Sequence, residues 1–232
     1  MYYFNYYTLG ILLIPGLLLS IYAEIKVQST YHKYKQVSSM NGAPAHVIAR
    51  MFLDVAGLHD IKIIPVRGYL SDYYNHRTKT IGLSEEVYNS TSIASIGIAC
   101  HEVGHALQYK NGYAPIKIRN FLIPICNFAN RMLWFLVILG LVFFYAGDGG
   151  IFIDIGVTVF ALTTILNLVT LPVEFNASKR AIKLLNSTGT LSTAECDGVE
   201  KVLGAAALTY VAAFVVSLLN LLRFIILFRD RD

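Results

Sequence analysis

The chain has 232 residues, of which 55% are hydrophobic and only 15% charged. Soluble domains carry about 25% charged residues, so this composition argues against an ordinary soluble enzyme and favours a membrane protein. The large hydrophobic fraction also excludes a disordered chain, because so much apolar surface must be buried. Three cysteines cannot all pair with one another, which argues against a disulfide scaffold, and a net charge of +4 does not indicate a nucleic-acid partner.

Four stretches are apolar enough to be membrane-spanning helices, which need about 20 mostly apolar residues. The first has no charged residue and lacks the basic start and cleavage site of a signal peptide, so we interpret it as an anchor. Asp154 and Arg223 lie near the ends of the third and fourth stretches, which favours an interfacial position for both. The predicted spans are about 8–23, 130–146, 151–172 and 204–228.

The basic residues close to these spans predict how the chain is oriented. Four spans place the polar regions 24–119 and 173–203 on the same side of the membrane. The basic side chains nearest the membrane belong to the first of these regions: Lys26, Lys33, Lys35, Lys117 and Arg119. The positive-inside rule therefore predicts a multi-pass protein of the cell membrane whose polar regions both face the cytoplasm.

The first polar region has the pattern of a small α+β cap. Residues 44–56 are expected to form a helix, because apolar side chains recur at helical spacing between a starting Pro44 and a terminating Gly57. Extended stretches are expected at 61–66 and 79–83, separated by a further extended stretch and a turn near Asn75–Arg77. A second helix is predicted from about Ser92 to Tyr109.

This second helix contains the sequence His101-Glu102-Val103-Gly104-His105. Histidines four residues apart lie on one face of a helix, so both imidazoles can reach the same ion. The glutamate between them can reach a water bound to that ion. The pattern is that of the HExxH zinc site of metallopeptidases. We therefore predict His101 and His105 as metal ligands and Glu102 as the catalytic base.

A catalytic zinc site of this kind needs a third protein ligand. The metzincin arrangement would require glycine at 108 and histidine at 111, where the chain has Gln108 and Asn111. Glu174 is the best candidate, because it follows the third span on the side of the HEVGH helix and would start a helix with its side chain inward. Four other acids remain alternatives, namely Asp72, Glu85, Glu195 and Glu200.

Several segments resemble the YugP-like neutral zinc metallopeptidases of bacteria, and the resemblance covers nearly the whole chain. These are HEVGHALQY, EFNAS, KVLGAAALTYVAA, VRGYLSDYYN and TIGLSEEVY. More distantly, the chain is similar to the HtpX and CAAX prenyl protease gluzincins, in which the Glu of an E-x-x-A-D motif is the third zinc ligand. The resemblance implies Glu174 as that ligand. Ser178 replaces the Asp that orients a zinc-bound histidine, so Asn176 or another acid would take over that role.

The predicted fold is a mostly α membrane protein with four transmembrane helices and a small α+β zincin-like cytoplasmic cap, forming one integrated domain over 1–232. One Zn²⁺ per chain would lower the pKa of a bound water to about 7, and Glu102 would move its proton to the leaving amine. The expected substrate is a peptide or membrane protein, and the lipid bilayer is the other expected partner. The gluzincin resemblance further implies that the strand near 79–83 pairs with extended substrate and that Tyr210 assists at the oxyanion.

Three other functions remain open. A non-proteolytic zinc-binding membrane scaffold is motivated by Ser178. A site-two-type intramembrane protease would need an L-D-G-like motif within a span and a longer apolar HEVGH helix, and the sequence has neither. The hypothesis of a transporter rests on the charged residues Asp154 and Arg223 alone.

Overall fold

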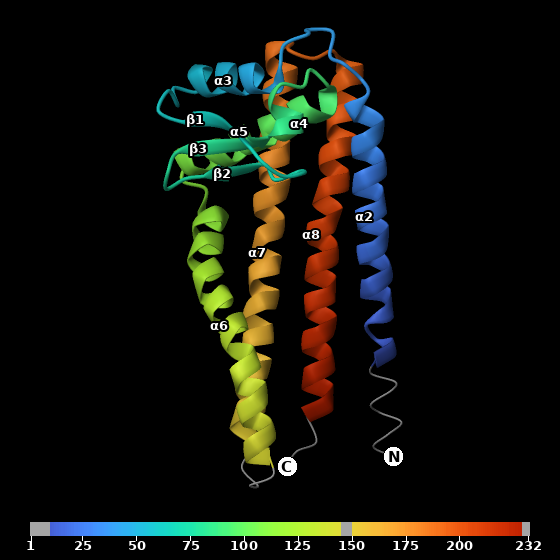
Figure 1. Cartoon of the computed structure of the whole chain (residues 1–232), viewed down its shortest axis with the longest axis vertical. Coiled ribbons are helices and arrows are strands. Elements are labelled where there is room, and N and C mark those ends of the chain that lie inside the picture. Colours follow the sequence, from blue (N-terminus) through green and yellow to red (C-terminus); the bar gives the residue numbers. More distant parts are fainter. Residues whose placement is uncertain (1–9, 145–149, 229–232) are drawn as a thin grey trace. The chain divides into compact units, whose positions relative to one another are not determined.

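The computed structural model describes residues 10–144 and 150–228, which are mostly helical and include a three-stranded sheet (Figure 1). The elements, in chain order, are α2 (Ile14–Lys35), α3 (Ala45–Val55), β1 (Lys62–Val66), β2 (Tyr73–Asn75), β3 (Thr80–Ser84), α4 (Glu85–Tyr88), α5 (Ile93–Lys110), α6 (Ala114–Phe144), α7 (Gly150–Thr188) and α8 (Thr193–Phe228).

These elements are divided between two compact units. The sheet unit comprises Ala23–Tyr113 and Pro172–Leu208. The helical unit comprises the described residues of the remaining segments, namely 10–22, 114–144, 150–171 and 209–228. The single integrated domain expected from the sequence stays a prediction.

The predicted elements of the first polar region are confirmed. Helix α3 begins directly after Pro44 and ends before Gly57, whose φ of 67° is a left-handed conformation that suits glycine. The turn between β2 and β3 forms because the Asn75 side-chain oxygen accepts hydrogen bonds from the backbone N–H groups of Arg77 and Thr78. Such local hydrogen bonds depend on neighbouring residues only, which is why the sequence pattern predicts them.

The sheet has the strand order β1-β3-β2, so β3 is the central strand. It pairs in parallel with β1 over Thr80–Ser84 and antiparallel with β2 over Thr80–Gly82. The backbone N–H of Ser84 then donates to the Asp72 carboxylate. The expectation that the strand near 79–83 pairs with substrate is therefore wrong, because the β2 hairpin and β1 already occupy both of its edges.

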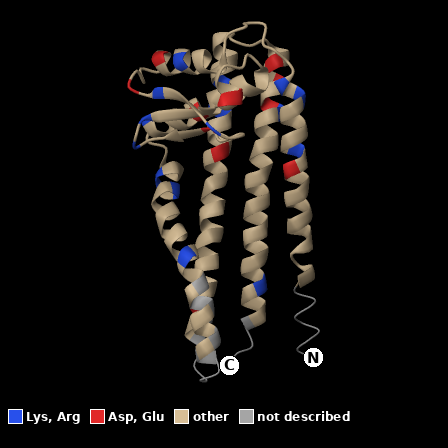
Figure 2. Cartoon of the chain, in the orientation of Figure 1, with Lys and Arg blue, Asp and Glu red and all other residues tan. Residues whose placement is uncertain are grey.

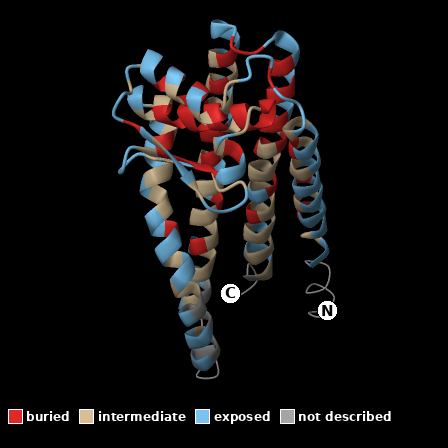
Figure 3. Cartoon of the chain, turned by 45° about the horizontal axis from the view of Figure 1, so that its top comes forward, coloured by how far each residue is buried: buried red, intermediate tan, exposed pale blue. Residues whose placement is uncertain are grey.

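The core of the sheet unit gathers around α5, and side chains of α3, β3, α7 and α8 pack against it. Buried residues concentrate in the sheet unit (Figure 3). The start of α8 is held by a capping box, in which Glu195 accepts from the Ser192 N–H and the Ser192 hydroxyl accepts from the Glu195 N–H. The same carboxylate accepts from the backbone N–H of Met40, so Glu195 joins the α2–α3 loop to α8.

Within the described residues, two helices are long and apolar enough to cross a membrane, judged by length and composition. They are Asp154–Thr188 in α7 and Thr193–Leu227 in α8, and only 17% and 28% of their apolar windows are buried. Charged residues are sparse in the described parts of the helical unit and frequent in the sheet unit (Figure 2). The other two predicted spans fall in α2 and α6, with residues 8, 9, 145 and 146 outside the described chain, and the four-span topology stays a prediction.

Helix α7 differs from the sequence expectation at its midpoint. Glu174 was expected at the start of a new helix, but α7 runs without a break from Gly150 through Pro172 to Thr188. The hydroxyl of Tyr113 donates to the Pro172 carbonyl at this point. The position of Glu174 is therefore set by a continuous helix, whose side chains keep a regular angular spacing across the proline.

Candidate metal centre

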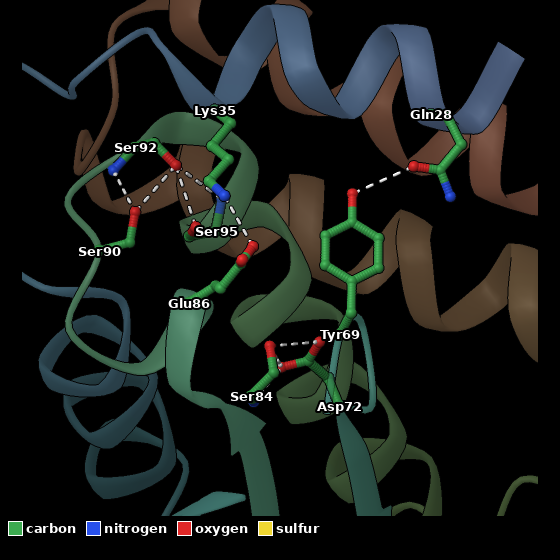
Figure 4. Close-up of polar contacts among 9 residues, drawn as sticks. All are labelled: Gln28, Lys35, Tyr69, Asp72, Ser84, Glu86, Ser90, Ser92 and Ser95. Carbon is green, nitrogen blue, oxygen red and sulfur yellow. Dashed lines mark hydrogen bonds and ion pairs between the residues drawn. The ribbon is translucent and has the colours of Figure 1, made fainter. Parts of the chain in front are cut away.

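Helix α5 carries both histidines of the HEVGH motif on one face. Its first turn is capped by Ser92, whose hydroxyl accepts from the Ser95 N–H (Figure 4). The imidazole rings of His101 and His105 lie with their centroids 4.7 Å apart and nearly perpendicular. His105 is buried and His101 is partly buried, so α5 presents two imidazoles inside the core rather than on a solvated surface.

Glu174 reaches these histidines from α7. Its Oε2 atom lies 3.2 Å from Nε2 of His101 and 3.5 Å from Nε2 of His105. One ligand atom of each of the three residues lies within 4.8 Å of the other two. Glu174 is only 2% exposed, so its carboxylate is shielded from solvent beside the two imidazoles. The structure thus brings together the three residues predicted as metal ligands.

The donor set fits a zinc ion. Two imidazole nitrogens and one carboxylate oxygen are the ligands of His₂Glu catalytic zinc sites, which keep a fourth position for water. The Nδ1 atom of each histidine is engaged by another side chain, namely Ser178 for His101 and Gln108 for His105. Both Nε2 atoms are therefore the nitrogens directed at the common point, as metal coordination requires.

Glu102, the second residue of the HEVGH motif, is 7% exposed. Burial raises the pKa of its carboxyl, and the charges of His105 and His101 offset this effect only in part. For His105, burial acts to lower the pKa, but the hydrogen bond to Glu174 and the negative charge of Glu102 outweigh it and raise the pKa. The motif therefore places an acid–base group and a pair of imidazoles in mutual electrostatic contact.

Gly104 allows α5 and α7 to come close enough for this cluster. A Cβ atom at this position would lie 2.4 Å from the carbonyl oxygen of Ala177 and 3.1 Å from its Cα. These are backbone atoms, so they cannot move aside as a flexible side chain would. Gly104 is thus required for the close contact of α5 with α7 that places Glu174 beside the histidines. The sequence pattern alone assigns no role to this glycine.

Replacing Gly104 with alanine is expected to destabilise the protein by about 1–3 kcal/mol, because α5 and α7 must separate to relieve the overlap. Zinc affinity should fall at the same time, since the separation moves Glu174 away from the histidines. Chemical unfolding and zinc titration measure the two effects. Gly204→Ala is the matched control, because no atom beyond its own stretch of helix lies within 4 Å of its added Cβ and alanine favours helix. Unchanged stability and affinity in Gly104→Ala would contradict the contact.

Two side chains that support the histidines were predicted differently. Ser178 was expected not to fill the role of the family Asp that orients a zinc-bound histidine, but its hydroxyl lies 3.1 Å from Nδ1 of His101. Asn176, suggested as a substitute, instead bonds Gln108 and Arg180. In the sequence, Gln108 stands out only as a departure from the metzincin pattern. Its position one turn after His105, on the same helix face, is the signal that could have identified it.

The alternative third ligands serve other roles or lie elsewhere. Asp72 accepts hydrogen bonds from the backbone and hydroxyl of Ser84 (Figure 4), and burial raises the pKa of its carboxyl. Glu195 caps α8, and Glu85 and Glu200 are exposed. Among the described residues, the three-membered metal-ligating group contains none of these acids. Tyr210 belongs to the part of α8 in the helical unit, and its role at the oxyanion stays a prediction.

A cavity of about 500 Å³ lies between α7 and α8 in the sheet unit. Its wall is mostly apolar and includes Phe175, Ile182 and Leu203. Asn176 and Ser178 contribute polar groups to the same wall. The cavity therefore adjoins the side of α7 that holds the partners of His101 and Gln108.

Comparison with known proteins agrees with this chemistry. The sequence model of a family described as "Putative neutral zinc metallopeptidase" matches residues 9–229. The chain is 43% identical to the "Putative membrane protease YugP" of Bacillus subtilis (strain 168) over 217 residues, which cover 94% of this chain and 95% of that protein. No solved structure matches the chain. Because the family match extends over nearly the entire sequence, and the cluster of two histidines and a glutamate fits its chemistry, the chain belongs to the neutral zinc metallopeptidase family.

Proposed function

We propose that this protein is a membrane-embedded, zinc-dependent endopeptidase that hydrolyses peptide bonds at the cytoplasmic surface of the cell membrane. The observation that carries this proposal is the convergence of the His101, His105 and Glu174 ligand atoms within 4.8 Å, beside the buried Glu102. The family match supports the peptidase chemistry, and the two apolar helices support an association with the membrane.

His101, His105 and Glu174 would hold the zinc ion, and Glu102 would carry the proton transfers. The ion, when bound, supplies a Lewis acid that acidifies water and polarises the scissile carbonyl. Glu102 accepts the proton of the attacking water and donates it to the leaving amine. Burial raises the pKa of Glu102, which brings its proton affinity closer to that of the groups it exchanges with. Tyr210 is proposed to assist at the oxyanion.

The proposed orientation follows from charge and hydropathy. Four spans, two of them supported by the apolar lengths of α7 and α8, would place both polar regions on the cytoplasmic side. A peptide segment or an unfolded membrane protein is the proposed substrate. The contact between Ser178 and the Nδ1 atom of His101 supports the peptidase over the scaffold alternative, which was motivated by the replacement of the family Asp by Ser178.

Removal and return of zinc tests the proposal directly. The purified full chain, in detergent, is incubated with an unfolded membrane protein before and after treatment with a chelator, and then with one equivalent of zinc. Cleavage is expected to stop with the chelator and to return with zinc, because the three ligands alone cannot activate water. A preparation of Glu102→Gln protein purified in parallel controls for contaminating proteases. Zinc-loaded protein that cleaves neither this substrate nor a pool of peptides would overturn the proposal in favour of a scaffold.

A further inference from the structure

Gln108 is a fully buried amide that joins the two helices of the metal cluster. It lies on α5, one turn after His105, and is 0% exposed. Its Nε2 atom donates to the Val173 carbonyl at 2.7 Å and to the Asn176 side-chain oxygen at 3.1 Å. Its Oε1 atom lies 3.0 Å from Nδ1 of His105. The Gln108 side chain thus contacts His105, which is one predicted metal ligand. It also contacts the backbone carbonyl of Val173, the residue directly before Glu174, which is another.

The partners of Gln108 determine which way its amide points. The Val173 carbonyl can only accept a hydrogen bond, so the NH₂ group must face α7. Asn176 is oriented in the same sense, because its oxygen accepts from Nε of Arg180 at 2.7 Å and a guanidinium can only donate. Both N–H groups of the Gln108 amide then donate hydrogen bonds to acceptors on α7. The remaining oxygen, an acceptor, is left facing His105.

An acceptor at Nδ1 dictates the tautomer of His105. Nδ1 must carry the proton to donate to Gln108, and in the neutral imidazole Nε2 then holds the free lone pair. Nε2 is the atom that faces Glu174. The hydroxyl of Ser178 can either donate or accept, so its contact with His101 does not impose a tautomer in the same way.

From this geometry we infer that Gln108 is a positioning residue: it locks His105 in the Nδ1–H tautomer and ties the HEVGH helix to the turn of α7 that carries Glu174. The inference rests on the proposed zinc site for its purpose. It assigns to a neutral, buried amide the task that a carboxylate commonly performs for zinc-bound histidines.

Zinc affinity of Gln108→Met tests the inference. Methionine matches glutamine in length and leaves neither an acceptor for Nδ1 nor a donor for Val173. The expected result is zinc binding weakened about 10- to 100-fold, measured by competition with a chromophoric chelator. Ser95→Ala is the control for general destabilisation, because Ser95 is buried on the same helix and hydrogen-bonds Ser92 at the α5 cap rather than the histidines. It should bind zinc as tightly as the wild type. Wild-type affinity in Gln108→Met would overturn the inference.

A measurement on the unaltered protein keeps the test valid even if Gln108→Met folds poorly. Cadmium-113 replaces zinc in protein labelled with ¹⁵N-histidine, and the cadmium–nitrogen coupling identifies the nitrogen that binds the metal. Coupling to Nε2 of His105 with a protonated Nδ1 is expected, whereas coupling to Nδ1 would overturn the inference. Wild-type protein that binds no zinc would overturn the proposed function as well. If the wild-type protein binds zinc and cleaves its substrate, and Gln108→Met binds zinc equally tightly, only the role of Gln108 is overturned.

Discussion

Glu102→Gln is expected to slow peptide hydrolysis by about 100- to 10,000-fold, the contribution typical of a positioned acid–base group. Glutamine has the same shape but cannot take up the proton of the attacking water or deliver it to the amine. The zinc ligands are untouched, so zinc content should equal that of the wild type. The comparison of kcat on one defined peptide, with the zinc content of both proteins measured in the same samples, provides the result.

The Glu102→Gln protein should also fold. Burial raises the pKa of Glu102, which means that the native environment already disfavours the charged form. A neutral isostere removes this cost, so the variant is expected to be as stable as the wild type. Glu85→Gln, at an exposed position on α4, is the matched control and should retain full activity. Undiminished cleavage by Glu102→Gln would remove the basis for the peptidase mechanism.

Glu174→Gln is expected to weaken zinc binding by more than about 100-fold. Loss of a residue that merely orients a ligand already costs about 10- to 100-fold, and an amide oxygen is a far poorer zinc ligand than a carboxylate. The Oε2 atom of Glu174 is the atom shared by both histidines at 3.2 and 3.5 Å, so its replacement removes the charge at the centre of the cluster. Zinc content after dialysis against a weak chelator measures the effect.

A second acid provides the comparison for Glu174. Glu200 lies on α8 in the same unit but is exposed, and its change to glutamine should leave zinc binding unaltered. Equal zinc affinity in Glu174→Gln and the wild type would mean that another residue is the third ligand. The alternatives Asp72 and Glu195 would then be tested in turn. Their contacts with Ser84 and Ser192 already account for both carboxylates.

The parts of the fold that sequence patterns predicted are those with local causes. The helix of HEVGH, the helix after Pro44, the turn at Asn75 and the apolar stretches of α7 and α8 all depend on residues within a few positions of one another. The spacing of His101 and His105 follows from helix geometry alone, so their shared face needed no tertiary information. The same holds for Glu102, which is defined by its place between them.

Sequence patterns predict the pairing of distant segments less well. The central position of β3 depends on how β1 and β2 add to its two edges, and an isolated run of β-forming residues does not encode strand order. The continuity of α7 through Pro172 was missed for a related reason. Proline usually ends a helix, but the surrounding structure can override this local preference.

The sequence by itself determined the HEVGH motif, its helix, the place of the proposed base Glu102 between the histidines and the apolar character of the chain. Tertiary structure decided how α5 crosses α7: Gly104 permits contact with the Ala177 carbonyl, Gln108 reaches Val173, and Glu174 arrives between two imidazoles. The physical reason is that helix periodicity operates over a few residues, whereas these contacts join positions more than 60 residues apart and arise only when two surfaces pack at atomic distance.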